Sequence, residues 1–520
     1  MQSVAGDAEK VTGEPARSRW IALAGMCTAA GLVWLAFADL GVALPTIAQE
    51  LKVSVTDLQW VNNAFSLVCG ALVLAAGRFS DLYGRRRLLL IGIVVFGGFS
   101  LLTSLLSGLA GLILGRALMG AGAAMILPAT LALIPPLFPR SEQPRAFGAW
   151  MAVAWVGQAA GPAVGGVLTD LLGWRSLFWI TAPLAAIAYL IVARFTPESR
   201  DEGLVGGVDA IGFGTSALAA FCLLYALTEG QSIGFGAPLI IGLLVAAVVL
   251  AVAFVVAEKR IRNPLVDLRL FRARDFDGAL IANLVMNIVF AGISFLFALY
   301  LQDVRGYSPL KAGLLLFPST FTILALNPVG SRAGTRRGPR LIVVLGLLIL
   351  GAGTIVAGIV SPTSSYALLA TGLLILGAGL GLLSVPISDT AVAGPPAELA
   401  GMASGLFKMS SMLGGALGVA ILAGLAKAIG RHNAEQQARA AGLTDSQISR
   451  LGNSLTKSDN ASTVLAGLPA DTRQQVIEAY QRAEAAGVAG AVKIAGVLAI
   501  VAALALLWIW PRRARDSSSR

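Results

Sequence analysis

Fourteen mostly apolar stretches, each long enough to cross a bilayer, constrain this sequence more than any other feature. A membrane-spanning helix needs about 20 such residues to cross a hydrocarbon core of roughly 30 Å. The 520 residues are 56% hydrophobic and 13% charged, whereas soluble domains carry nearer a quarter charged residues. We therefore predict an all-α membrane protein with fourteen transmembrane helices. The stretches are 20–46, 57–77, 88–106, 109–135, 146–169, 174–195, 209–228, 237–258, 276–301, 309–330, 340–361, 366–388, 400–428 and 488–510.

The positive charges lie where a membrane protein keeps its cytoplasmic loops. Lys and Arg collect on the cytoplasmic side of membrane proteins. If the N-terminus is inside, the cytoplasmic segments hold 25 of the 39 Lys and Arg residues and the short outer loops only four. Topology therefore explains the net charge of +11, and we predict no nucleic-acid partner. Both termini are expected in the cytoplasm, and the protein in the cytoplasmic membrane.

The sequence lacks the motifs of an ATP-driven pump or of an enzyme. It contains no GxxxxGK[ST] phosphate-binding loop and no GxSxG nucleophile motif. Its single histidine, His432, excludes an HExxH zinc site. The three cysteines, Cys27, Cys69 and Cys222, fall within apolar runs, as small packing residues do. We predict no metal, no cofactor and no catalytic residue, which leaves ion-coupled transport with carboxylates as proton carriers.

Two connections between the apolar runs are long. The first, 258–275, is basic and joins the two halves of the chain in the cytoplasm. The second, 429–487, lies outside the membrane, and near its end Asp471 fits a helix N-cap. This second segment is either an amphipathic hairpin packed on the outer rim or a gate or partner-docking element. The expected parts are a cytoplasmic tail (1–19), a six-helix bundle (20–195), two extra transmembrane helices (209–258), a basic linker (259–275), a second six-helix bundle (276–510) that includes 429–487, and a cytoplasmic tail (511–520).

The two halves repeat one charged loop. Residues 331–343, SRAGTRRGPRLIV, follow one span and precede another, as residues 77–89 do. When the two are aligned, Gly338 matches Gly84, but Thr335 stands opposite Asp81. Internal repeats with a binding site between two halves are a known plan of transporters. The repeat therefore predicts a two-bundle transporter whose second loop has lost the acid.

Several motifs in a fixed order carry a resemblance to a known family. GRFSDLYGRRR follows the second span, LILGRALMGAGAAMILP forms the fourth, and WVGQAAGPAVGG lies in the fifth. LYLQDVRGYSPLKAGLLLFP joins spans nine and ten, and GMASGLFKMSSMLGGALGVAIL forms the thirteenth. Together they resemble the major facilitator superfamily, specifically its fourteen-span drug–proton antiporter branch, over about 20–428.

The resemblance implies a fold of two six-helix bundles plus two extra helices, and alternating access between them. It implies a proton-coupled antiporter of the multidrug-efflux type that exports small amphiphilic organic compounds. Its partners would be the substrate, protons and membrane lipids, and we expect a monomer. Two alternatives stay open: an exporter of an endogenous lipid or anionic metabolite, and a sensor or binding protein with a transporter fold.

The loop after the second span supplies a candidate cytoplasmic gate of Gly77, Asp81, Gly84 and Arg85. The glycines permit a tight backbone and a close helix approach, and a carboxylate is stabilised at a helix N-terminus. The resemblance implies that Asp81 contacts the start of the thirteenth span and holds the cytoplasmic side closed. The arginines of the loop either share that role or only anchor the topology.

Asp39 and Arg116 are the candidate proton-coupling residues. An Arg in mid-membrane costs about 2.5–3.5 kcal/mol on insertion scales and usually faces an interior partner, although it can also reach toward an interface. Asp39, in the first span, is the expected partner. The resemblance places the family's usual acid at Ala36, one helical turn earlier, so Asp39 either replaces that acid or has another role.

Span five carries glycines on one face, at Gly157, Gly161 and Gly165, with Gly166 adjoining them. Such spacing lets another helix approach closely, and Pro162 can kink the helix. The resemblance names these residues as the antiporter motif and implies that their partner is span ten.

Polar and aromatic residues within the spans are candidates for the substrate cavity, since apolar pockets with a few polar groups suit amphiphilic ligands. Lys408 is the most unusual, because relatives tend to carry Asn there. It either binds an anionic group or an acid, or reaches up to the cytoplasmic interface. The others either line the cavity or only join helices by hydrogen bonds. The candidates are Asn62, Asn63, Trp155, Gln158, Asn283, Asn287 and Lys408.

Overall fold

The computed structural model describes residues 16–53, 55–200, 209–261, 264, 266–396, 399–440 and 470–510. Within these ranges the chain forms helices and short connections and contains no strand, as predicted. Residues 441–469 of the predicted extracytoplasmic segment lie outside the described residues, as do 1–15 and 511–520 of the two tails.

The first half of the chain consists of long apolar helices with short helices between them. Helix α8 is a single helix of 30 residues. The elements are α2 (Ala16–Ala38), α3 (Leu40–Leu51), α4 (Val55–Tyr83), α5 (Arg85–Leu105), α6 (Leu109–Ala132), α7 (Ile134–Leu137), α8 (Gln143–Leu172), α9 (Ser176–Trp179), α10 (Thr181–Phe195), α11 (Ala210–Ile233) and α12 (Pro238–Glu258).

The second half has fewer and longer helices, two of which end in a turn of π-helix. These turns follow α13 and α16. The elements are the 3₁₀ turn η1 (Leu268–Arg272), α13 (Arg274–Leu299), η2 (Tyr300–Val304), α14 (Pro309–Arg337), α15 (Pro339–Ala357), α16 (Tyr366–Ser388), η3 (Asp389–Ala393), α17 (Ala400–Ala440) and α20 (Ala470–Ile509).

The local sequence explains many of the helix ends. Asp209 caps α11, because its side chain accepts a hydrogen bond from the Gly212 amide at 2.7 Å. α12, α14 and α15 begin with proline, which suits the first turn of a helix. Gly84 and Gly338 separate consecutive helices with φ of 108° and 89°, a region that favours glycine. The two loops that the sequence repeat pairs therefore use the same backbone conformation at matching positions.

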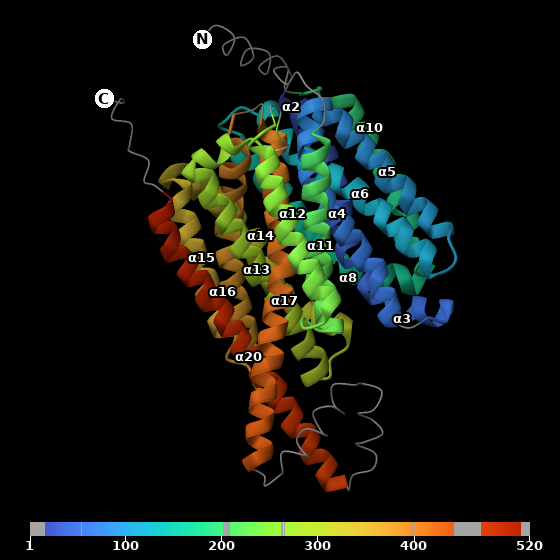
Figure 1. The fold of residues 1–520 in the computed structure, drawn as a ribbon, viewed down its shortest axis with the longest axis vertical. Helices are drawn as coiled ribbons and strands as arrows, with labels where there is room; N and C mark the ends of the chain where they lie inside the picture. Colours follow the sequence, from blue (N-terminus) through green and yellow to red (C-terminus); the bar gives the residue numbers. More distant parts are fainter. Residues whose placement is uncertain are drawn as a thin grey trace.

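Helices of one half pack mainly against each other, and several helix pairs join the halves. α4 packs on α6, α2 on α8 and α5 on α6, while α13 packs on α17, α14 on α16 and α15 on both α16 and α20. Across the middle, α17 packs against α4 and α6, and α14 packs against α8. α2 begins and α20 ends at the same end of the bundle (Figure 1).

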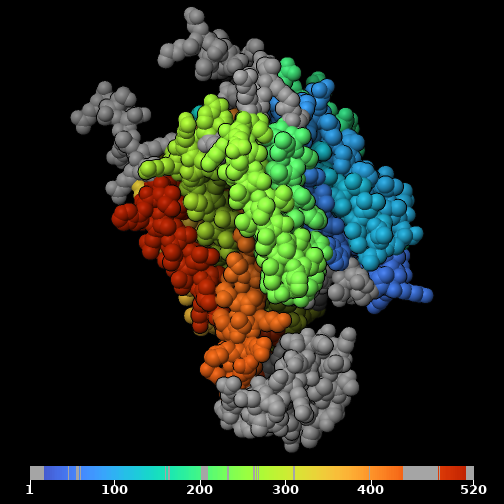
Figure 2. Space-filling view, viewed as in Figure 1, coloured from blue at the N-terminus to red at the C-terminus, as the bar shows by residue number. Residues whose placement is uncertain are grey.

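The two extra helices cover one edge of the boundary between the halves. α11 packs against α12, and it also contacts α4 of the first half and α17 of the second. In Figure 1 the pair runs between α17 and α4, and Figure 2 shows its green surface between the orange of α17 and the blue of the first half. Few residues of α12 are buried, so this helix presents apolar side chains to the outside of the bundle.

Thirteen helices among the described residues are long and apolar enough to cross a membrane. α8 is not among the thirteen, but it covers the remaining predicted stretch, 146–169, as one helix. The count of fourteen spans therefore stays a prediction.

α17 and α20 extend beyond the rest of the bundle, at the end opposite to the start of α2 (Figure 1). They pack against each other there, and Gly487 approaches Gly430 so closely that a Cβ at residue 487 would lie 3.1 Å from the Gly430 nitrogen. The flanks of the predicted segment 429–487 are thus continuations of two spans. Asp471 falls within the first turn of α20 and not before it, so the prediction of an N-cap at Asp471 was wrong.

The glycine face of α8 packs against α2, and the predicted partner, span ten, was wrong for these residues. A Cβ added at Gly165 would lie 3.0 Å from the carbonyl carbon of Asp39. The span-ten helix α14 also packs on α8, so the spacing correctly indicated a close contact but not its partner. Pro162 falls within the α8 range, and its side chain lies outside the described residues. The contacts are Gly157 with Gly31 and Trp34, Gly161 with Ala38, and Gly165 with Asp39.

We predict that Gly165→Ala destabilises the protein, because the new methyl group overlaps the backbone of α2. Overpacking of this kind costs about 1–3 kcal/mol. Gly98→Ala in α5 is the matched control, since a Cβ there meets nothing within 4 Å, and it should be neutral or stabilising by up to about 1 kcal/mol. Thermal unfolding of the purified proteins, followed by tryptophan fluorescence, measures the difference. Equal apparent Tm values for the two variants would contradict the tight contact.

Candidate functional site

Asp81 joins the two halves of the molecule at the end of α4. Its Oδ1 accepts a hydrogen bond from the Gly401 amide at 2.8 Å, and its Oδ2 accepts one from the Met402 amide at 2.7 Å. The side chain is fully buried. Since α17 begins at Ala400, the carboxylate lies at the positive end of that helix and accepts from amides that have no partner within the helix. The contact that the family resemblance implies is therefore present.

Arg85 neutralises this carboxylate from the first turn of α5. Its Nε and Nη2 both donate to Asp81 Oδ1, at 3.0 and 2.7 Å, and the side chain is 2% exposed. A buried carboxylate without a counter-charge would be very costly. Of the two readings that the sequence left open, the structure favours a role in the gate contact for Arg85, rather than a topology anchor alone.

Glycine allows α4 and α17 to approach closely enough for this bond. A Cβ at Gly77 would lie 2.9 Å from the Gly405 Cα and 2.5 Å from the Gly401 carbonyl oxygen, closer than real side chains come. Gly84 ends the loop with a positive φ. The four predicted gate residues, which are Gly77, Asp81, Gly84 and Arg85, thus lie in one contact region.

A second carboxylate, which the sequence reading missed, caps α5. Glu198 Oε1 and Oε2 accept hydrogen bonds from the amides of Arg86 and Arg87, each at 3.1 Å, and the Arg85 amide donates to the Ser199 carbonyl at 2.8 Å. The pattern repeats that of Asp81, with one carboxylate across two successive amides at a helix start. It fixes the start of α5 to the segment that follows α10.

The matching loop of the second half makes a weaker contact. Thr335 is exposed, and its hydroxyl donates only to the Arg332 carbonyl of its own helix, at 2.9 Å. The hydroxyl of Ser331 donates to the Pro144 carbonyl at the start of α8, at 3.1 Å. Each loop therefore meets the first turn of a helix in the other half, but only the first loop does so with a carboxylate.

Arg116 lies in the interior of the first half and is 1% exposed. Its Nη2 donates to the Ala36 carbonyl at 2.8 Å and to Asn62 Oδ1 at 2.9 Å, while its Nε makes a longer bond of 3.4 Å to the Val61 carbonyl. The guanidinium carbon lies 4.4 Å from the centre of the Phe65 ring, which adds a cation–π attraction. Arg116 is held inside the protein and does not reach an interface.

Asp39 interacts electrostatically with Arg116, as the sequence reading expected, but the two side chains form no direct ion pair. The ion pairs of the described residues do not include these two side chains, which interact electrostatically at longer range. The Nη2 group of Arg116 bonds instead to the Ala36 carbonyl and to Asn62 Oδ1. Asp39 is buried, with 6% of its surface exposed, in the bend between α2 and α3. Asn62, a predicted cavity residue, serves instead as a partner of Arg116.

Lys408 of α17 is buried where the two halves meet. It is 4% exposed, so it does not extend to the cytoplasmic interface. Its Nζ lies 4.4 Å from the ring centre of Trp150, 5.2 Å from that of Trp34 and 5.4 Å from that of Phe407. The Cys69 thiol of α4 interacts with it electrostatically. Lys408 thus lies in a box of aromatic rings from both halves.

Some of the remaining candidates for the substrate cavity join helices by hydrogen bonds, and others lie where the two halves of the protein meet. Asn283 is fully buried and donates to the Phe407 carbonyl at 2.9 Å and to the hydroxyl groups of Ser410 and Ser411; Asn287 donates to the Asn283 carbonyl at 2.8 Å.

These two asparagines therefore follow the alternative reading, in which they join α13 to α17 or bond within α13. Trp155 of α8 contacts Phe290 of α13 edge-on, with ring centres 4.8 Å apart, so it lies where the halves meet. Asn63 and Gln158 are half-buried on α4 and α8.

Sequence reasoning missed the aromatic side chains that surround the buried charges. Trp34 and Trp150 flank Lys408, and Phe65 flanks Arg116. Each stands in an apolar run, where an aromatic residue normally indicates only packing. Their spacing relative to Lys408 is invisible in the sequence, because the three helices that meet there are far apart along the chain.

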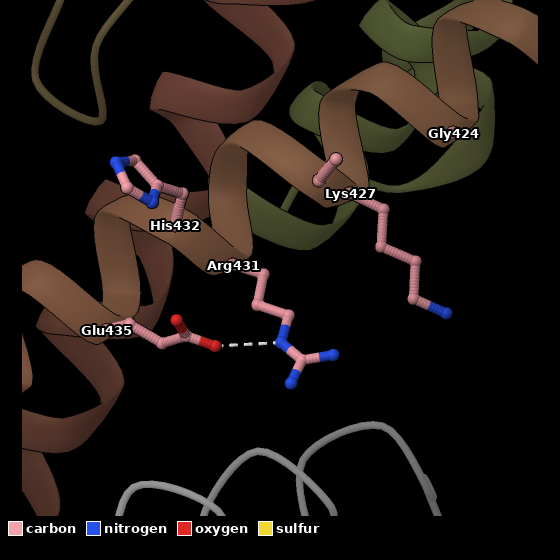
Figure 3. A pocket seen from close by; sticks show the side chains of 6 residues that line it. Gly424, Lys427, Arg431, His432 and Glu435 are labelled. Carbon is pink, nitrogen blue, oxygen red and sulfur yellow. Dashed lines mark hydrogen bonds and ion pairs between the residues drawn. The ribbon is translucent and has the colours of Figure 1, made fainter. Parts of the chain in front are cut away.

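A hollow of about 550 Å³ lies away from this site, on the outer extension of α17. All its lining residues come from that helix, and Figure 3 shows Arg431 paired with Glu435 while His432 points to the other side. Within the part of the chain that the structure describes, no group of three or more His, Cys, Asp or Glu side chains could hold a metal ion. The hollow is lined by Gly424, Lys427, Ala428, Arg431, His432 and Glu435.

Comparison with known proteins identifies the family. The sequence model of the Major Facilitator Superfamily matches residues 21–419. The chain belongs to the Major Facilitator Superfamily. As a member of this superfamily it is a transporter and not an enzyme, and its many apolar helices make it a multi-pass membrane protein.

Curated relatives of this superfamily member are named for drug resistance and efflux. It is 35% identical over 394 residues, 75% of this chain and 73% of the relative, to the multidrug resistance protein Stp of Mycobacterium tuberculosis. It is 30% identical over 503 residues, 95% of this chain and 97% of the relative, to the multidrug efflux pump LfrA of Mycolicibacterium smegmatis. The solved structure of the human organic anion transporter MFSD10 covers 94% of this chain and 100% of that one with a TM-score of 0.60 at 15% identity, which supports the Major Facilitator fold.

We predict that Asp81→Asn opens the contact between the Major Facilitator halves. A hydrogen bond to a charged group contributes about 1.5–3 kcal/mol, and every 1.4 kcal/mol is about tenfold in an equilibrium. Cys69 is a native reporter, because it is fully buried and lies within electrostatic reach of Lys408 of the other half. In a background of Cys27→Ala and Cys222→Ala, maleimide labelling of Cys69 should be at least about tenfold faster in the variant.

Asp170→Asn serves as the control, since Asp170 is an exposed acid near the end of α8. It should leave the labelling rate unchanged. If Asp81→Asn and Asp170→Asn label at the same rate, Asp81 does not hold the halves together.

Proposed function

We propose that this protein is a proton-coupled antiporter that exports small amphiphilic organic compounds across the cytoplasmic membrane. The observation that carries the proposal is the buried pair of Asp39 and Arg116, two opposite charges that interact without forming an ion pair. The names of the relatives, which include multidrug efflux pumps, support the substrate class.

A carboxylate can carry a proton only if both its charged and its neutral form are tolerated. A direct ion pair with Arg116 would strongly favour the charged form of Asp39. Here Arg116 donates hydrogen bonds to acceptors on α2 and α4. It attracts the charge of Asp39, but these hydrogen bonds do not depend on that charge. Asp39 can then gain and lose a proton while the Nη2 group of Arg116 keeps its hydrogen-bond acceptors.

The Asp81 contact supplies the other requirement, a barrier on one side. With Asp81 bonded to the start of α17, the halves are joined at the cytoplasmic end in the orientation that the charge distribution predicts. Proton binding at Asp39 from outside would accompany substrate release, and proton loss to the cytoplasm would reset the transporter. One charge that crosses a membrane potential of 100 mV supplies about 2.3 kcal/mol.

This orientation places both termini in the cytoplasm. The two bundles, 20–195 and 276–510, move about a substrate site at their boundary. The extra pair, 209–258, and the linker, 259–275, bridge that boundary from outside. We propose a monomer as the transporting unit.

Proteoliposomes with an acidic lumen test the proposal. Protein-dependent, gradient-driven uptake of at least one compound from a panel of ethidium, puromycin and ciprofloxacin is expected. Asp39→Asn should lower that uptake at least about tenfold, because the amide cannot exchange a proton. Asp170→Asn should keep it.

Substrate counterflow without a gradient distinguishes a coupling role from a folding defect. Asp39→Asn should retain counterflow if it only loses coupling. Unchanged gradient-driven uptake in Asp39→Asn would remove Asp39 from the mechanism, and an absence of gradient-driven uptake for the whole panel would overturn the proposed function.

A further inference from the structure

Lys408 stands apart from the other buried charges because it lacks a counter-charge. Asp81 is paired with Arg85, and Asp39 interacts with Arg116. Among the described residues, Lys408 makes no ion pair and no hydrogen bond through its Nζ, and the only ionisable group that interacts with it electrostatically is the Cys69 thiol.

The aromatic box compensates this charge only in part. Each cation–π contact contributes about 0.5–2 kcal/mol, whereas a buried, unpaired ammonium is far more costly. Ring faces also offer no acceptor to the three N–H groups that an ammonium carries. The site therefore lacks negative charge and hydrogen-bond acceptors, but not apolar contact.

A second unpaired donor lies on the same box. Trp34, whose ring centre is 5.2 Å from Lys408 Nζ, has a buried Nε1 with no hydrogen-bond partner among the described residues. Trp150, in contrast, donates to the Thr130 hydroxyl at 3.1 Å, which fixes its ring as a rigid wall. The box thus presents an ammonium and an indole N–H, two donors that suit one acceptor group.

The two halves share this box. Trp34 and Trp150 belong to α2 and α8 of the first half, while Phe407 and Lys408 belong to α17 of the second. Lys408 follows the Asp81-bonded residue Gly401 by two helical turns, which is about 10 Å along α17. Release of the Asp81 contact and separation of the halves would therefore expose Lys408 first toward the end of the molecule where Asp81 lies.

We infer that the Lys408 box is a binding site for an oxyanion carried on an aromatic body, such as an aromatic carboxylate or sulfonate. This inference rests on the proposed export function and names its substrate class. The oxyanion pairs with Lys408 and accepts from the Trp34 N–H, and the aromatic body packs on the rings. An amphiphilic cation gains the same ring contacts but is repelled by the ammonium.

Two fluorescent probes with one aromatic body test this inference. 8-Anilino-1-naphthalenesulfonate and N-phenyl-1-naphthylamine share the anilinonaphthalene group and differ only by the sulfonate. Binding to the full-length protein in nanodiscs is measured as tryptophan-sensitised probe emission above that of empty nanodiscs. The sulfonate should bind at least about tenfold more tightly than the neutral amine.

Variants of α17 assign the preference to one residue. Lys408→Gln and Lys408→Met should reduce it to about twofold or less, and Lys408→Arg should preserve it. Lys427→Gln removes an exposed charge from the same helix and should leave it intact. Because two different neutral variants are measured, the misfolding of one of them does not decide the test.

Equal binding of the two probes, or a preference that survives both neutral variants, would overturn the inference. This outcome is independent of the flux measurement. Anion preference without gradient-driven uptake would defeat the antiporter proposal alone, whereas uptake without anion preference would defeat the Lys408 inference alone.

Discussion

The bond between the Asp81 carboxylate and the first amides of α17 sets the relation of the two halves. There a buried charge of the first half is bonded directly to the backbone of the second. Arg85 neutralises the carboxylate, Gly77 allows the helices to come close enough, and Glu198 accepts hydrogen bonds from amides at the start of α5. Lys408 and Cys69, which lie near this boundary, are buried while the contact is closed.

Much of this arrangement could be predicted from the sequence because the membrane imposes simple rules. The need to bury backbone groups in lipid makes each apolar stretch a helix, so the α-helical fold and most spans followed directly. The Asp81 contact was expected from the resemblance of its loop motif to that of the family. That only the first half carries such an acid followed from Thr335, which stands in the matching position. In the structure Thr335 is exposed and its hydroxyl bonds only within its own helix.

The predictions that were wrong concern which helix faces which. Gly157, Gly161 and Gly165 correctly indicated a close approach, but a small face accepts any neighbour, and here it accepts α2. Arg116 needed acceptors, and the sequence suggested the nearest carboxylate. A backbone carbonyl at Ala36 and the Asn62 amide provide them instead, and no one-dimensional pattern shows an available carbonyl. The aromatic box of Lys408 went unseen for the same reason.

The proposed proton carrier, Asp39, lies one helical turn beyond Ala36, where the family resemblance expects the acid. A main-chain oxygen cannot titrate, so the guanidinium of Arg116 has a permanent anchor, and the titratable group lies three residues farther along, about 4.5 Å of helix. Asp39 also occupies the bend where α2 gives way to α3, and its amide still donates to the Leu35 carbonyl at 2.9 Å. If Asp39 carries the proton and the N-terminus is cytoplasmic, this displacement places the acid nearer to the external solution.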